Sequence, residues 1–268
     1  MPTVFEVRHL NRDVEGAAAR SFAYRFLAEA FAFPEPEGWD WLQRSDTVRA
    51  FRAAIGSAWP TVSGLHELAN TAIGAIASTG LETARDDHLR AFGYTVRGAC
   101  PPHEIEYGDN RADALFRPHR LANLAALYRA FGMELDELVR ERQDHLAIEC
   151  EFASILAARS AHALETGYED GIAACENAWA LFLREHIGRW VQAFASKLDT
   201  AKPATWLLAS ARLLAAVVRS DCASLGIVPG AVDVGLVSYD VAGDDFCTET
   251  CGLPGMPQPR TISGSTLM

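Results

Sequence analysis

Apolar residues recur at intervals of three and four along most of this chain, which is the spacing of one buried face of an α-helix. The first such series consists of Phe22, Phe26, Ala30 and Phe33. Asn11 or Asp13 can cap the start of this helix, and Pro34 follows its end. A chain in which this spacing repeats has to bury its helix faces against one another.

The same pattern predicts further helices downstream. They cover residues 39–55, 62–77, 81–92, 169–197 and 203–223. Nothing in the chain alternates strongly enough between apolar and polar residues to indicate a sheet, and there is no internal repeat. We therefore expect an all-α fold, in which a single domain forms a helical bundle.

A segment without helical period interrupts this series. Residues 93–110 contain glycines and two adjacent prolines, and they are expected to form a loop. Pro118 suits the first turn of the next helix, whose buried stripe includes Tyr128 and whose stop signal is Gly132. A short acidic helix is expected over residues 135–140.

Asp144 stands directly before the next apolar segment, where its carboxylate can cap the exposed amides of a helix start. The apolar side chains of that helix are Leu146, Ile148, Phe152, Ile155 and Leu156. Such a broad apolar face is typical of a helix in a bundle interior.

The chain changes character at Gly226, after which glycines and prolines are frequent and a regular helix is not expected. We divide it into a helical domain, residues 1–225, and an irregular C-terminal extension, residues 226–268. Part of the extension is expected to fold back onto the bundle. Cys247 and Cys251 are weak candidates for a metal site, because their spacing is not CxxC and no second pair completes them.

Composition limits the classes of function. The formal net charge of −11 disfavours a nucleic-acid partner and suits a basic peptide. No stretch reaches the roughly 18 apolar residues of a membrane-spanning helix. The first residues carry charges where a secretory signal would have an apolar core. We therefore expect a cytoplasmic protein.

Sequence signatures of catalysis and of bound metal are absent. The chain has no GxxxxGK[ST] phosphate loop, no GxSxG nucleophile turn and no Glu-x-x-His motif of a di-metal bundle. His145 and Glu149 are four residues apart, which is more typical of a surface ion pair than of a ligand pair. We expect no enzymatic activity, no metal and no resident cofactor.

Four motifs, taken in order, resemble the redox-enzyme maturation chaperones of the TorD/DmsD/NarJ type. They are HLRAFG, CPPHEIEYG, LANLAALYRAFG and RQDHLAIECEFASILA. FLREHIGRWVQAFASKL and the helix after Pro203 are also similar to that family. The resemblance covers roughly residues 15–225 and is carried by the order of the motifs. The chain departs from the family at Gln143, where the family has proline, and at His103, where it has an aromatic residue.

The resemblance implies an all-helical cytoplasmic chaperone, monomeric or homodimeric, that serves anaerobic respiration. Its partner would be the catalytic subunit of a molybdenum oxidoreductase of the DMSO reductase type, bound through a twin-arginine signal peptide or an N-terminal region. Binding would withhold that subunit from export until its molybdopterin cofactor is inserted. Transient contact with molybdopterin guanine dinucleotide or GTP is compatible with this role.

The resemblance and the residues together indicate a peptide-binding site. Its candidate residues are Asp144, His145, Glu104, Tyr107, Tyr128 and Glu106. The carboxylates can meet guanidinium groups, the tyrosines can line an apolar groove, and the charge of His145 is expected to change near neutral pH. The residues alone leave simpler roles open: Asp144 as a helix cap, Tyr128 in the core and the two glutamates as loop charges.

Two other functions stay open at this point. A guanine-nucleotide-binding enzyme of cofactor handling would turn over nucleotide, although the phosphate loop is missing. A helical accessory subunit would remain in the mature complex, whereas a chaperone leaves it.

Overall fold

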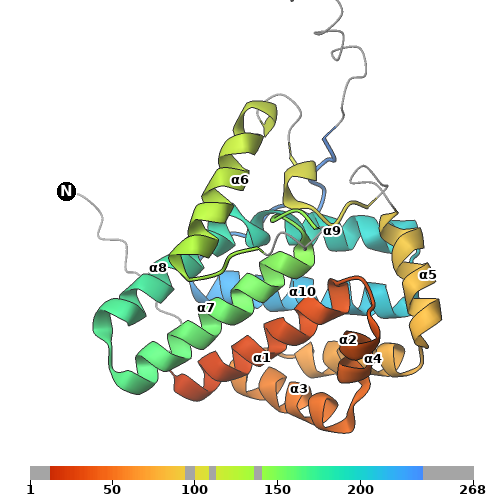
Figure 1. The fold of residues 1–268 in the computed structure, drawn as a ribbon, viewed down its shortest axis with the longest axis horizontal. Helices are drawn as coiled ribbons and strands as arrows, with labels where there is room; N and C mark the ends of the chain where they lie inside the picture. The colour runs from red at the N-terminus through yellow and green to blue at the C-terminus, as the bar shows by residue number, and fades with distance from the viewer. Residues whose placement is uncertain (1–12, 94–99, 109–112, 136–140, 238–268) are drawn as a thin grey trace, which may run out of the picture. The chain divides into compact units, whose positions relative to one another are not determined.

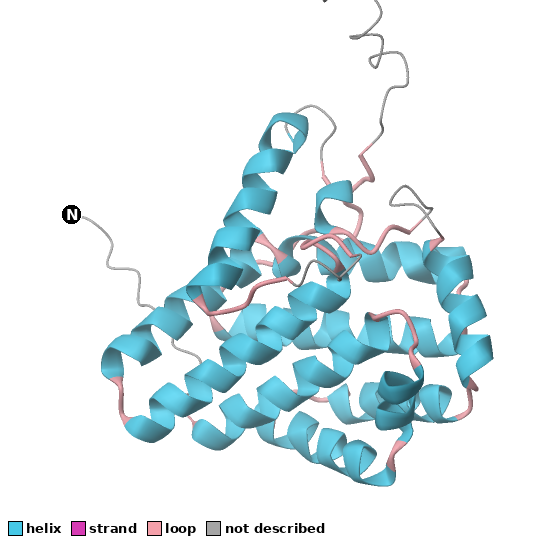
Figure 2. Cartoon of the chain, viewed as in Figure 1, coloured by secondary structure: helices cyan, strands magenta, loops and turns pink. Residues whose placement is uncertain are grey.

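A computed structural model of the chain describes residues 13–93, 100–108, 113–135 and 141–237. Within these ranges the chain consists of α-helices joined by loops, with one short 3₁₀ helix and no strand (Figures 1 and 2). The prediction of an all-α fold is therefore confirmed. No helix in the described ranges is long and apolar enough to cross a membrane.

The helices are α1 (Val14–Phe31), α2 (Pro36–Gln43), α3 (Ser45–Ala58), α4 (Leu65–Ala77), α5 (Leu81–Phe92), the 3₁₀ helix η1 (Glu104–Glu106), α6 (Asp113–Ala130), α7 (Leu146–Thr166), α8 (Glu169–Glu185), α9 (Ile187–Ala201) and α10 (Thr205–Ser224).

Helix α1 packs along α7 on one side and along α3 on another, while α10 packs against α4 and α9 (Figure 1). Phe26 of α1 stacks on Phe51 of α3, with 3.9 Å between the ring centroids. Tyr24 of α1 meets Trp179 of α8 edge-on. These rings are buried, and each contributes about 1.5–3 kcal/mol by leaving water. Of the stripe predicted for this helix, Phe26 and Ala30 are buried and Phe22 is partly buried, whereas Phe33 lies beyond the end of α1 and is exposed.

Two of the long predicted helices are each divided by a single residue. Arg44 has extended backbone angles and separates α2 from α3, and His186 separates α8 from α9. The apolar period does not reveal such breaks, because the buried face continues on both sides of them. Just after the second break, a Cβ on Gly188 would lie 2.0 Å from the carbonyl oxygen of Leu183, so the close approach of the chain requires glycine.

Helix α6 begins earlier than the sequence suggested. Pro118 lies inside the helix, and the prediction that it occupies the first turn is wrong. A proline there removes one i→i−4 backbone hydrogen bond, and its side chain is exposed. The described part of residues 93–110 is a loop apart from η1, while the acidic helix expected over residues 135–140 falls almost wholly outside the described residues.

The start of the C-terminal extension contacts the helical domain, as expected. The amide of Gly230 donates to the carbonyl of Gly188 at 2.9 Å, and the amide of Val237 donates to the carbonyl of Glu106 at 2.9 Å. The remainder, residues 238–268, lies outside the described residues, so the boundary at residue 226 stays a prediction.

Candidate functional site

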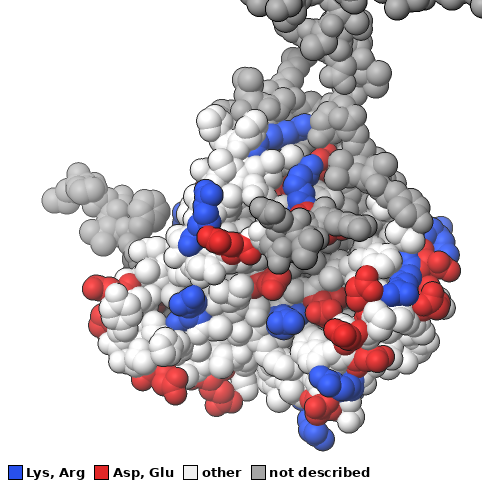
Figure 3. All heavy atoms as spheres, in the orientation of Figure 1, with Lys and Arg blue, Asp and Glu red and all other residues white. Residues whose placement is uncertain are grey.

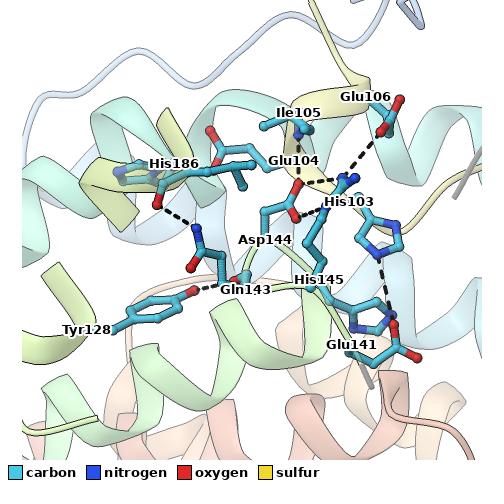
Figure 4. A network of polar contacts seen from close by, with 12 residues as sticks. His103, Glu104, Ile105, Glu106, Tyr128, Glu141, Gln143, Asp144, His145 and His186 are labelled. Atoms are coloured by element: carbon cyan, nitrogen blue, oxygen red, sulfur yellow. Dashed lines mark hydrogen bonds and ion pairs between the residues drawn. The ribbon is translucent and has the colours of Figure 1, made fainter. Parts of the chain in front are cut away.

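The loop of residues 100–108 lies across the start of α7 and is joined to it through the backbone. The amide of Glu104 donates to the carbonyl of Asp144 at 3.0 Å. Beside this bond, His103 and His145 form an isolated antiparallel bridge. Figure 4 shows that residues predicted from two distant motifs gather here into one polar network.

Asp144 is fully buried, and its carboxylate binds two partners outside α7. The guanidinium of Arg142 donates to it, with 2.9 Å between Nη2 and Oδ2, and the amide of Ile105 donates at 3.1 Å. The prediction that Asp144 caps α7 is wrong. The cap is His145, whose Nδ1 accepts from the amide of Ala147 at 3.2 Å. A guanidinium is a stronger partner for a carboxylate than an amide is, so Asp144 turns toward Arg142.

Glu104 and Glu106 are also buried, which excludes the simpler reading of both as ordinary loop charges. His186 Nδ1 donates to Glu104 Oε2 at 3.0 Å, and Arg189 Nη2 lies 3.4 Å from Oε1 of the same carboxylate. Glu106 pairs with Arg142 across 3.2 Å. Sequence reasoning missed these partners of the two glutamates, because only the break between α8 and α9 brings His186 to the loop.

Glu149 adds another carboxylate to this interior. Its Oε2 accepts from the Trp190 indole at 3.2 Å, while its Oε1 has no hydrogen-bond partner within the described residues. Burial, reinforced by the charge of Glu104, raises the pKa of Glu149 well above its usual value. The interpretation of His145 and Glu149 as a surface ion pair is wrong, because both side chains are buried and have other partners.

The two predicted tyrosines lie in the interior. Tyr107 donates to the carbonyl of Pro101 at 3.0 Å and packs on Trp190, with 5.1 Å between ring centroids. Tyr128 donates to the carbonyl of Gln143 at 3.0 Å and is 2 % exposed, so its place in the core is confirmed. Burial raises the pKa of both phenols, which therefore stay protonated and act as donors.

His145 and its neighbour His103 are buried and uncharged at neutral pH. Burial lowers the pKa of His145 well below 6.5, and the nearby His103 lowers it further. Burial also lowers the pKa of His103 to about 4. The expectation that the charge of His145 changes near neutral pH is therefore wrong.

An open cavity of about 220 Å³ lies between α1 and α7 at the edge of this network. Its polar lining consists of Arg25, Glu29, Glu141, His145 and Glu151, and its apolar lining consists of Ala28, Ala32, Phe33, Ala147 and Ile148. Burial raises the pKa of Glu29 and of Glu141. Acidic side chains also occur elsewhere on the face of the molecule that Figure 3 shows, interspersed with basic ones. Such a lining suits a ligand that combines a cationic group with an apolar one.

The structure therefore brings the six predicted residues together but exposes little of them. His145 is the one among them that lines this cavity, and Tyr128 lines a separate hollow of about 290 Å³ beside α6. The cavity carboxylates Glu29 and Glu151 were not identified from the sequence, where they look like ordinary charges on amphipathic helices. Cys247 and Cys251 lie outside the described residues.

Comparison with known proteins gives a family match and two named relatives. A model of the nitrate reductase delta subunit family matches residues 58–196. The chlorate reductase assembly chaperone protein of Ideonella dechloratans is 24 % identical over 193 residues, which are 72 % of this chain and 83 % of that protein. The selenate reductase assembly chaperone protein of Thauera selenatis is 26 % identical over 195 residues, which are 73 % of this chain and 84 % of that protein.

Proposed function

Because the chain belongs to the nitrate reductase delta subunit family, a family of NarJ- and TorD-like assembly chaperones, we propose that it is the assembly chaperone of a molybdenum oxidoreductase. Members of this family are chaperones and not catalysts, so an enzyme of cofactor handling is not the function of this chain. The resemblance seen in the sequence motifs is thereby confirmed.

The partner in this proposal is the catalytic subunit of an enzyme of the DMSO reductase type. The chaperone binds its twin-arginine signal peptide or N-terminal region in the cytoplasm and holds the subunit back from export until the cofactor is inserted. The chaperone keeps no cofactor of its own, and its contact with molybdopterin guanine dinucleotide or GTP is transient. It acts as a monomer or a homodimer.

The observation that carries this proposal is the cavity between α1 and α7. Glu29, Glu141 and Glu151 line it together with a single cationic residue, Arg25, so its charge attracts arginine side chains of a peptide. Its apolar lining, which includes the partly exposed Phe33, offers a surface for an apolar peptide segment.

The six residues predicted from the sequence support this cavity. His145 forms part of its wall. Asp144, Glu104 and Glu106 act through their ion pairs, which fix the loop of residues 100–108 beside α7. Tyr107 and Tyr128 act through packing and through their bonds to loop carbonyls.

The proposal is tested first by identifying the partner and then by measuring its peptide. The tagged chain is purified from its native host while molybdenum enzymes are being made, and bound proteins are identified by mass spectrometry. A synthetic peptide with the N-terminal sequence of the enriched catalytic subunit is then titrated calorimetrically into wild-type chain and into a Glu29→Gln/Glu151→Gln variant.

The double variant is expected to bind the peptide about tenfold more weakly, since two partly exposed charge pairs contribute about 1.4 kcal/mol together. Glu165→Gln is the matched control, because Glu165 is an exposed carboxylate on α7 outside the cavity. Equal affinities for wild type and double variant would remove the cavity from the binding site. Failure to enrich any molybdenum enzyme subunit would contradict the function itself.

The family is named after a subunit of nitrate reductase, which favours one alternative. An accessory subunit would remain with the mature enzyme in equal amount, whereas an assembly chaperone is released after cofactor insertion. Measuring the ratio of this chain to the catalytic subunit, in active enzyme purified through a tag on that subunit, distinguishes the two.

A further inference from the structure

Three potential metal ligands converge where the loop of residues 100–108 meets the turn before α7. His103 Nε2 and His145 Nε2 each lie 3.9 Å from Oε2 of Glu141, and ligand atoms of all three residues lie within 4.8 Å of one another (Figure 4). The two imidazoles are buried, while the Glu141 side chain is 47 % exposed. This is the one such group of histidine, cysteine and carboxylate side chains within the described residues.

The ring of His103 lacks a partner that would explain its position. It is 5 % exposed, and neither of its nitrogens has a hydrogen-bond partner among the described residues. Leaving a buried polar group unpaired costs about 1–3 kcal/mol. At 3.9 Å its contact with Glu141 is too long for a hydrogen bond. The ring is therefore aimed into the cluster without a bond to hold it there.

Backbone hydrogen bonds position the main chain of both histidines before any ligand arrives. The His103–His145 bridge lies between two backbone hydrogen bonds, one from Glu104 to Asp144 and one from Leu146 to Pro102 at 2.8 Å. The rings meet edge-on, with 5.1 Å between their centroids. A site whose ligands are positioned by backbone bonds loses little entropy when it binds an ion.

We propose that His103, Glu141 and His145 bind a divalent first-row transition metal ion, with Zn²⁺ as the best match. Two imidazoles and one carboxylate are a ligand set for such ions, and three protein ligands leave one position for water. Bonds of about 2.0–2.1 Å in a tetrahedron put ligand atoms about 3.4 Å apart. The Glu141 oxygen has to approach each ring by about half an ångström, which its exposed side chain can do, and the two ring nitrogens have to come closer to each other through rotation of the side chains.

Binding requires one rearrangement at His145. Its Nδ1 accepts from the amide of Ala147, so the proton of the neutral ring is on Nε2, the nitrogen that faces Glu141. A metal bond at Nε2 moves that proton to Nδ1 and ends the cap bond. Loss of a helix cap costs about 1 kcal/mol, which is small compared with the free energy of a three-ligand metal site.

The ion has a path to the site from solvent, because Glu141 and His145 both line the cavity between α1 and α7. Glu29 and Glu151 line the same cavity but are not among the three proposed ligands of the ion. Bound metal would join the loop of residues 100–108 to α7 more firmly than their backbone bonds alone. The proposal concerns metal binding only and stands whether or not the cavity takes a peptide.

The test uses the full chain, purified without a metal-affinity step, in a Cys247→Ser/Cys251→Ser background that removes the two cysteines of the C-terminal extension. Chelator-treated protein is titrated with Zn²⁺ by calorimetry and with Co²⁺ by visible absorption. We expect one equivalent to bind, with the absorption of tetrahedral Co²⁺.

His103→Ala and Glu141→Gln are each expected to weaken Zn²⁺ binding by at least about 100-fold, since loss of an outer-shell partner alone costs about 10–100-fold. His162→Gln, which alters an exposed histidine outside the cluster, should bind as wild type does. Circular dichroism checks that each variant is folded, and the exposed Glu141 keeps the test valid should His103→Ala unfold. Absence of stoichiometric binding by the wild-type chain, or equal affinity in folded Glu141→Gln, would overturn the proposal.

Discussion

Two buried aspartates anchor two polar networks of different character. Asp221 on α10 accepts from the Tyr24 hydroxyl at 2.8 Å, from the Trp59 indole at 2.8 Å and from Arg20 Nε at 3.0 Å. All of these donors belong to helices or to a helix end, and Arg20 is nearly buried. Asp144 instead pairs with Arg142, which is 30 % exposed, and with the amide of Ile105 in the short 3₁₀ helix η1.

The balance of donors and acceptors differs as well. The Asp221 network has one carboxylate and several donors, so its polar groups satisfy one another. Around Asp144, buried carboxylates accumulate, and Glu149 Oε1 and both nitrogens of His103 have no hydrogen-bond partner among the described residues. The first arrangement is typical of a network that holds a fold, and the second is typical of a place where a ligand completes the bonding.

The largest expected effect is a loss of free energy of unfolding when the Asp221 network is broken, and this loss should exceed that for the Asp144 network. Asp221→Ala leaves a buried guanidinium without its carboxylate, so it is expected to lower the free energy of unfolding by about 3–5 kcal/mol. Urea denaturation measures this change. Asp199→Ala is the control, because the Asp199–Arg212 pair is about half exposed and should contribute at most about 1 kcal/mol. A loss below about 1 kcal/mol at Asp221 would show that this network does not hold the fold.

Asp144→Ala is expected to cost less, about 2 kcal/mol, because water can reach the Arg142 guanidinium that loses its partner. The amide of Ile105 loses its acceptor at the same time, so its hydrogen exchange should become faster. Exchange of amides in the middle of α1 should stay slow. A loss as large as that of Asp221→Ala, with exchange faster throughout the molecule, would remove the distinction between the networks.

His88, which bonds to neither aspartate, tests the effect of burial on the pKa of a single histidine. His88 on α5 has Nε2 3.3 Å from the carbonyl oxygen of Phe31, and burial lowers its pKa to about 4. Between pH 6.5 and pH 4 the unfolded chain therefore binds more protons than the folded chain, and stability falls as the pH falls. From pH 7 to pH 5 the contribution is about 2 kcal/mol.

The measurement compares urea denaturation at the two pH values for wild type and His88→Phe. The variant should lose about 2 kcal/mol less on acidification than wild type does. An identical loss in both proteins would mean that the ring of His88 does not carry this share of the pH dependence.

The helices could be predicted from the sequence, because the period that indicates each of them is local. The stripe through Phe22 and Phe26 and the apolar face after His145 predict α1 and α7. The apolar period does not show which helices lie side by side. The cavity is formed by Glu29 on α1 and Glu151 on α7, and these residues become neighbours only when the two helices pack.

The candidate site was predictable to the extent that short motifs name its residues. Glu104 and Asp144 stand in two motifs of the resemblance, and the structure joins their backbones. The side chains that bond to these carboxylates were not predictable in the same way. His186 reaches Glu104 because the chain breaks between α8 and α9, and nothing in the apolar period indicates that break.

The smallest expected effect concerns the carboxylates that face the cavity. Glu151→Gln is expected to change the free energy of unfolding by no more than about 0.5 kcal/mol, because the residue is exposed and forms part of neither buried network. Thermal denaturation beside Asp144→Ala measures the difference. If these charges serve a ligand, the variant should alter peptide affinity while the melting temperature stays within about 2 °C. A clear loss of stability would instead place Glu151 among the residues that hold the fold, and the cavity would lose one of the groups that distinguish it from the Asp221 network.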